Sequence, residues 1–130
     1  MIDHLIIGVG DIARSRVFYD AALAPLGYRR SRDDGAGSGY SRADAGPEMI
    51  HPRDFWIVAA AGAAPAPGFH FAFKAPDRRA VDGFYVAALG AGGSDCGAPG
   101  LRPRYHANYY GAFVADPDGH RIEAVCHTPT

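Results

Sequence analysis

The 130-residue sequence is poor in cysteine, with only Cys96 and Cys126. These two residues lack Cys-x-x-Cys spacing and are too few for a disulfide framework, which predicts a reducing compartment and a cytoplasmic location. Long apolar runs are missing as well, since none approaches the roughly 18 residues that a membrane helix needs. The first 16 residues carry neither a basic leader region nor a cleavage site. We therefore expect neither a membrane span nor a signal peptide.

An excess of charge of one sign is also absent. Thirteen basic and 14 acidic residues are scattered along the chain and leave a formal net charge of −1. No segment is basic enough to follow a phosphate backbone, so nucleic acid is not an expected partner. Hydrophobic residues make up 48% of the chain, which is typical of one globular domain, here spanning residues 1–130.

An internal repeat is present at a constant offset of 66 residues. Residues 4–27 align with residues 70–93 without a gap, and eight of the 24 pairs are identical. The identical pairs are His4/His70, Asp11/Asp77, Phe18/Phe84, Tyr19/Tyr85, Ala21/Ala87, Ala22/Ala88, Leu23/Leu89 and Gly27/Gly93. A repeat of this length indicates two copies of one supersecondary unit.

Each copy predicts a short strand followed by a helix. The apolar segments Ile2 to Val9 and Phe69 to Ala75 are typical of strands. Asp11 and Asp77 follow them, where a carboxylate can accept the free amide hydrogens of a first helical turn. Apolar residues then recur at helical spacing until glycine ends each helix, at Gly27 in the first copy.

Further strands complete two equivalent halves. We expect strands at residues 28–32, 39–42 and 54–60 after the first helix, and at 109–115 and 121–127, around an Asp-Pro-Asp-Gly turn, after the second. Each half is thus a β-α-β-β-β module: the first spans about residues 1–60 and the second about 69–127, with a proline-rich linker at 61–68. A module of about 60 residues buries too little surface to be stable alone, so the two should pair.

This pattern resembles the vicinal oxygen chelate superfamily. The shared features are the paired modules, a histidine in the first strand of each, and the Asp-Pro-Asp-Gly turn followed by Arg121-Ile122-Glu123. Members include glyoxalase I, extradiol dioxygenases, fosfomycin-resistance enzymes and bleomycin-binding proteins. The resemblance covers residues 1–127 and implies an α+β fold, in which paired modules form a curved eight-stranded sheet around a cup. It also implies a metal held by side chains that point into the cup.

Strand alternation supports a set of three metal ligands. His4, His70 and Glu123 each occupy a position that can face the cup while neighbouring residues pack into the core. Glu123 lies in an otherwise apolar stretch, where an unpaired carboxylate is costly. Two imidazoles and one carboxylate suit a divalent metal such as Fe, Mn, Ni or Zn and leave positions open for a substrate.

A fourth ligand is missing at the position that the repeat indicates. The 66-residue offset places Ile57 opposite Glu123, and isoleucine cannot bind a metal. This departure argues against lactoylglutathione isomerisation, because glyoxalase I chemistry relies on two glutamates around the metal. His51 or Asp54 could supply the ligand, or no residue does, and the protein could also hold no metal at all.

Substrate-binding residues are expected between the second helix and the last two strands. The segment 98–110 is interpreted either as a solvated loop whose aromatics cap the cup or as a binding segment. In the second interpretation an anionic or polar substrate is held by Arg102, Arg104, Tyr105 and His106. The further candidates are Tyr109, Trp56 and Lys74 for substrate binding, and Tyr110, His106 and Glu123 for catalysis. Alternation allows only one of the two neighbouring tyrosines to face the cup, and a bulge would exchange them.

Two classes of function fit these residues. The first is a metal-dependent lyase, isomerase or extradiol-type dioxygenase, in which a small oxygenated substrate chelates the metal. The alternative is a metal-free protein that sequesters a small molecule, as the bleomycin-binding members do. Exposed sheet edges predict a homodimer in either case, and the cup could lie within one chain or between two.

Overall fold

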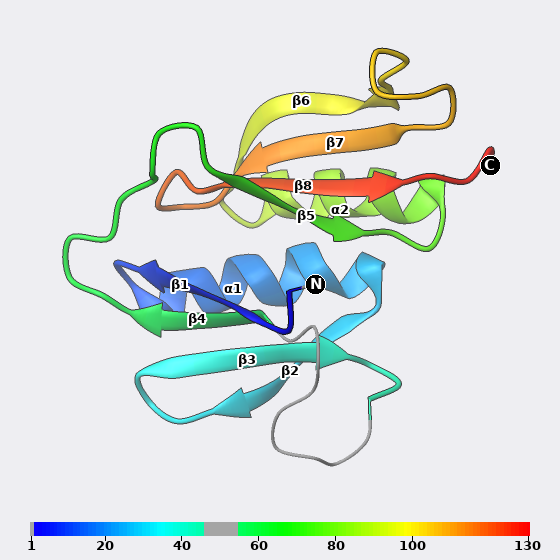
Figure 1. The fold of residues 1–130 in the computed structure, drawn as a ribbon. Helices are drawn as coiled ribbons and strands as arrows, with labels where there is room; N and C mark the ends of the chain where they lie inside the picture. Colours follow the sequence, from blue (N-terminus) through cyan, green and yellow to red (C-terminus); the bar gives the residue numbers. More distant parts are fainter. Residues whose placement is uncertain (1, 46–54) are drawn as a thin grey trace.

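The computed structural model describes residues 2–45 and 55–130 and confirms an α+β fold of two β-α-β-β-β halves (Figure 1). The first half contains β1 (Leu5–Val9), α1 (Ile12–Leu23), the 3₁₀ turn η1 (Ala24–Leu26), β2 (Tyr28–Asp33), β3 (Gly37–Arg42) and β4 (Phe55–Ala59). The second half contains β5 (His70–Lys74), α2 (Arg78–Gly90), β6 (Ser94–Leu101), β7 (Tyr110–Ala115) and β8 (Arg121–Cys126). Neither helix is long and apolar enough to cross a membrane, as judged on the described part of the chain.

The helices begin where the sequence predicts. The Asp11 side chain accepts a hydrogen bond from the Arg14 amide, and Asp77 accepts one from the Ala80 amide at 2.8 Å. Both aspartates thus satisfy a free donor of the first turn. The first helix continues into η1 and ends at Gly27, whose φ of 86° is a left-handed value that glycine adopts without strain.

The eight strands form two sheets with the same topology. Their orders are β1-β4-β3-β2 and β5-β8-β7-β6, with one parallel pair in each, β1 with β4 and β5 with β8. Figure 1 shows a helix behind each sheet, and α1 and α2 contact each other. The apolar faces of the sheets therefore point toward the helices, and the opposite faces remain open for a site.

Aromatic side chains join the two halves in one core. The Phe55 ring of β4 lies 5.4 Å from Phe71 and 5.4 Å from Phe73 of β5, measured between centroids. Tyr28 of β2 contacts Phe73 at 5.5 Å. Because aromatic rings bury large areas, these contacts pack the two halves against each other.

The Asp-Pro-Asp-Gly turn of the second half also binds the first half. Asp118 accepts hydrogen bonds from the Gly10 amide and from the Arg14 guanidinium, each at 3.1 Å. Buried Asp116 accepts one from the Tyr19 hydroxyl at 2.6 Å. Burial, and then the adjacent Asp116 carboxylate, raise the pKa of Tyr19 well above its ordinary value, so this phenol remains a donor.

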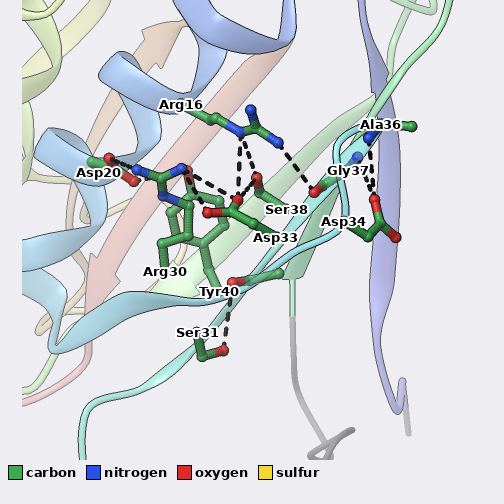
Figure 2. A network of polar contacts seen from close by, with 11 residues as sticks. Arg16, Asp20, Arg30, Ser31, Asp33, Asp34, Ala36, Gly37, Ser38 and Tyr40 are labelled. Carbon is green, nitrogen blue, oxygen red and sulfur yellow. Dashed lines mark hydrogen bonds and ion pairs between the residues drawn. The ribbon is translucent and has the colours of Figure 1, made fainter.

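A polar network covers the helix side of the first half (Figure 2). The Arg16 Nε donates to Ser38 Oγ at 2.7 Å, and the Arg30 guanidinium pairs with Asp20 and Asp33, each at 3.0 Å. These contacts fasten α1 to β2 and β3. The pKa of Asp33 is lowered, mainly by the Ser38 hydroxyl that donates to it. The network is structural, because it lies away from the open face of the sheet.

The expected loop at residues 98–110 is shorter than predicted, because β6 extends to Leu101. Two register shifts interrupt its pairing with β7, around Gly97 and Gly100. Gly97, whose φ is 149°, lies at one of these shifts. Because the shifts interrupt the alternation of side chains, the segment has no regular strand pattern in the sequence. The connection between β6 and β7 therefore consists of residues 102–109.

Candidate functional site

One polar site lies on the open face of the second sheet. Strand pairing places Ala72 of β5, Glu123 of β8 and Phe113 of β7 next to one another across this sheet. His70 and Arg121 are the adjacent pair on the same face. Helix α2 covers the opposite face (Figure 1). The alternation expected from the sequence therefore brings a histidine, an arginine and a carboxylate together.

Glu123 is the buried centre of this face, with only 2% of its surface exposed. Its Oε1 accepts a hydrogen bond from the Tyr109 hydroxyl, and its Oε2 lies 3.6 Å from His70 Nε2. Gly111 makes room for this arrangement, because a Cβ there would lie 3.1 Å from Glu123 Oε1. Burial, and then the bond to Glu123, raise the pKa of Tyr109, so the phenol remains protonated and donates.

The three expected metal ligands do not converge within this chain. His4 Nδ1 contacts Asp3 Oδ1 at 2.8 Å at the exposed start of the first half. Within residues 2–45 and 55–130, no three histidine, cysteine, aspartate or glutamate side chains form a group that could hold a metal. His4 and His70 do line one pocket of about 440 Å³, to which Lys74 also contributes. His51 and Asp54, the possible fourth ligands, lie outside the described residues.

The position equivalent to Glu123 is Trp56, and the expected equivalence with Ile57 is wrong by one residue. Ala72 pairs with Glu123, and its repeat counterpart Ile6 pairs with Trp56. Ile57 is fully buried in the core instead. Trp56 lies over Gly39, where a Cβ would come within 2.8 Å of the indole. An aromatic side chain thus occupies the position in the first half that the carboxylate occupies in the second.

An arginine-rich pocket of about 290 Å³ opens beside His70. It is lined by His70, Cys96, Gly97, Arg102, Arg104, Tyr105, Phe113 and Arg121. The Arg102 guanidinium lies over the Phe113 ring at 5.8 Å, and that of Arg104 lies over Tyr105 at 4.8 Å. No carboxylate of the described chain forms an ion pair with any of the three arginines. The pocket is therefore cationic and aromatic, which suits an anion.

The remaining candidates, Tyr109, Tyr110 and His106, lie in different places. Tyr109 faces the cup, whereas the hydroxyl of Tyr110 donates to Asp82 of α2 at 2.7 Å, so Tyr110 lies on the helix side of the sheet. The bulges in β6 do not exchange the two tyrosines. His106 lies in the connection between β6 and β7, where its Nε2 is 2.8 Å from Nδ1 of His127.

The sequence alone did not identify His127 or Arg121 as candidate site residues. His127 is exposed and contacts His106, and residues 121, 123, 125 and 127 alternate onto one strand face. The signal was therefore present in the spacing. Arg121 pairs with His70 on the face of Glu123 and lines the arginine-rich pocket.

Comparisons with known proteins agree with this fold. The model of the Glyoxalase/Bleomycin resistance protein/Dioxygenase superfamily matches residues 1–124. A glyoxalase/bleomycin resistance protein from Albidiferax ferrireducens T118 superposes with a TM-score of 0.84 and 29% identity, over 98% of this chain and 99% of that one. A glyoxalase-related enzyme from Fulvimarina pelagi gives a TM-score of 0.72 at 17% identity, over 97% and 87% of the two chains. No curated protein sequence matches the chain.

Proposed function

Because the chain belongs to the Glyoxalase/Bleomycin resistance protein/Dioxygenase superfamily, we propose that it binds a small oxygenated anion in the arginine pocket of the second sheet, without a metal. The observation that carries this proposal is the meeting of three arginines, none of them ion-paired with a described carboxylate, at one aromatic pocket. Arg102 and Arg104 donate to carbonyl and hydroxyl oxygens, and cations in a concave site without a described carboxylate partner favour an anionic ligand.

Each group at the pocket has a separate task. Arg102 and Arg104 are already stacked on aromatic rings, so less side-chain entropy is lost when they bind a carboxylate or a phosphate. Phe113 and Tyr105 offer surface to the apolar part of the ligand. His70 connects the pocket to Glu123, because its ring lines the pocket while Nε2 lies 3.6 Å from the carboxylate. A hydroxyl of the ligand would contact this imidazole.

A metal does not fit the residues that the structure brings together. Glu123 is engaged by Tyr109 and approached by His70, while His4 contacts Asp3. The metal-dependent lyase, isomerase or dioxygenase remains the second candidate, favoured by the approach of His70 to Glu123. In a site shared between two copies of the chain, the second copy would place another histidine near His70 and Glu123. The expected homodimer would therefore favour this alternative.

Calorimetric titration with salicylate tests the proposal. Salicylate combines a carboxylate, a hydroxyl and a ring, and benzyl alcohol is the neutral control. We expect salicylate to bind, benzyl alcohol to bind far more weakly, and EDTA treatment to leave the affinity unchanged. Arg102→Gln should raise the Kd about tenfold, because a hydrogen bond to a charged group is lost. Arg79→Gln, on the exposed side of α2, is the matched control.

Glu123→Gln separates the two candidates. It should leave salicylate binding largely intact under the proposal, and it should abolish metal uptake if the protein is a metal enzyme. Elemental analysis of protein purified without chelator completes the test. One equivalent of metal that disappears in the Glu123→Gln and His4→Ala variants would overturn the metal-free proposal.

A further inference from the structure

The connection between β6 and β7, residues 102–109, carries four side chains of the proposed site. We call it the pocket loop. Arg102, Arg104 and Tyr105 line the pocket, and Tyr109 covers Glu123. The loop closes on itself through a hydrogen bond from the Arg102 amide to the Tyr109 carbonyl at 2.7 Å. This bond continues the β6–β7 pairing and holds the ends of the loop, while the side chains of its middle residues make contacts outside the loop.

One of these contacts joins His106 of the pocket loop to His127, just beyond β8. Their ring centroids lie 5.1 Å apart and the ring planes are inclined by 27°. The Tyr109 ring lies edge-on to both imidazoles, at 5.5 Å from His106 and 5.3 Å from His127. The histidine pair thus supports the tyrosine whose hydroxyl donates to Glu123.

Hydrogen bonds determine where each imidazole carries its proton. The Asn108 amide donates to His106 Nδ1 at 3.1 Å, so this nitrogen is an acceptor and carries no hydrogen. The neutral ring then carries its proton on Nε2 and donates it to Nδ1 of His127 at 2.8 Å. His127 must accept at Nδ1, so its own proton is on Nε2. The chain of bonds from Asn108 through His106 to His127 therefore forms only when both imidazoles are neutral.

Resting on the proposed function, we infer that His106 and His127 form a pH-dependent latch that holds the pocket loop over the anion site. They are positioning residues, which act on the ligand through Arg102, Arg104 and Tyr109. Protonation of His106 places a hydrogen on Nδ1 against the Asn108 amide. A single proton can still be shared between His106 Nε2 and His127 Nδ1, at the cost of the bond from the Asn108 amide. Protonation of both rings leaves no acceptor nitrogen between them, so the bond that joins the loop to His127 is lost and two cations lie in contact.

Other charged and titratable groups surround the latch. Arg102 and Arg104 are the cations of the same loop that line the pocket. Glu123 of β8, a carboxylate, lies beneath Tyr109. Tyr105 and Tyr109, which contact each other at 4.7 Å, are the uncharged neighbours.

The direction of the pH effect distinguishes a latch from simple charge attraction. Imidazoles ordinarily change charge between pH 5 and 8. Added positive charge beside an anion site would by itself tighten anion binding as the pH falls. The latch predicts the opposite, because the loop that carries the arginines loses its anchor. If an anion that stays ionised throughout this range binds more weakly at low pH, the pocket loop has therefore moved away from the site.

The first experiment needs no ligand. Nitrogen NMR of the histidine rings at about pH 7.5 should show both His106 and His127 protonated on Nε2 only. On acidification, the Asn108 amide resonance should move together with the His106 ring. A different tautomer of either ring at neutral pH, or an Asn108 amide insensitive to His106, overturns the latch whether or not any anion binds.

The second experiment measures the Kd for salicylate from about pH 7.5 to about pH 5.5. The wild-type Kd should rise about fivefold, the factor expected for one lost net hydrogen bond. His127→Ala should show the weak affinity at both pH values. His127→Asn keeps an acceptor near the position of Nδ1 but does not titrate, so it should retain the tight affinity at low pH.

The outcomes separate the latch from the binding proposal. Absence of salicylate binding at about pH 7.5 overturns the proposed function, while the NMR result still decides the latch. Binding that tightens or stays constant on acidification overturns the latch and leaves the anion site standing. His127→Asn that behaves like His127→Ala also contradicts it, because the acceptor would then not matter.

Discussion

The hydrogen bond from Tyr109 to Glu123 should make a measurable contribution to stability. Tyr109→Phe removes the donor and leaves the buried carboxylate without its shortest contact. A hydrogen bond to a charged group contributes about 1.5 to 3 kcal/mol, and Tyr109 is only partly buried. We therefore expect the free energy of unfolding to fall by about 1.5 kcal/mol, the lower end of this range.

Glu123→Gln should cost less than Tyr109→Phe. The amide oxygen of glutamine can still accept from Tyr109, and the variant no longer buries a carboxylate, whose desolvation is unfavourable. In this background Tyr109→Phe should cost about 0.5 kcal/mol, because the lost bond joins two neutral groups. The difference between the two backgrounds, about 1 kcal/mol, is the coupling between the charge and the phenol.

Urea unfolding of the wild type, both single variants and the double variant measures this coupling. Equal slopes of unfolding free energy against urea across the four proteins are needed for the comparison. A coupling within about 0.3 kcal/mol of zero would refute the bond as a contact of the protein in solution. A large loss of stability in Glu123→Gln alone would show that the carboxylate is a structural residue rather than one reserved for a ligand.

Two further predictions concern the tyrosines. Tyr19→Phe should lower the free energy of unfolding by about 2 kcal/mol in urea, because it removes a buried donor to the Asp116 carboxylate, and a loss below about 0.5 kcal/mol would contradict the contact. Burial raises the pKa values of Tyr19, Tyr40 and Tyr109, so their contribution to stability is fully present below the ordinary tyrosine pKa of about 10 and decreases as the pH rises above it. An absorbance titration should show these phenols ionising only as the protein unfolds, and ionisation near pH 10 in the folded state would refute their burial.

Local signals predicted most of the fold. Asp11 and Asp77 cap their helices because the capping interaction depends only on the next three residues of the chain. The repeat predicted two equivalent halves for the same reason, since each copy contains its own strand, cap and helix. Strand β6 could not be placed, because its glycines and its register shifts hide the alternation that identifies a strand.

The site was predicted less completely, because it depends on the relative position of distant segments. Alternation placed His70 and Glu123 on one face, but it could not show that His4 contacts Asp3 instead. The partner of His106 is another example. Its contact with His127 spans 21 residues and requires the loop to fold back over the sheet.

The two halves share a topology but not a chemistry, and this difference favours a single ligand site. Trp56 occupies the position equivalent to Glu123, and Ile6 the position equivalent to Ala72, so the open face of the first sheet is apolar where that of the second is polar. Gly39 accommodates the indole in the first half, as Gly111 accommodates the glutamate and the tyrosine in the second. Selection for stability alone would favour the apolar solution in both halves, because a buried carboxylate costs desolvation energy. The presence of a buried Glu123 beside His70 in one half therefore agrees with the proposal that the ligand binds in that half.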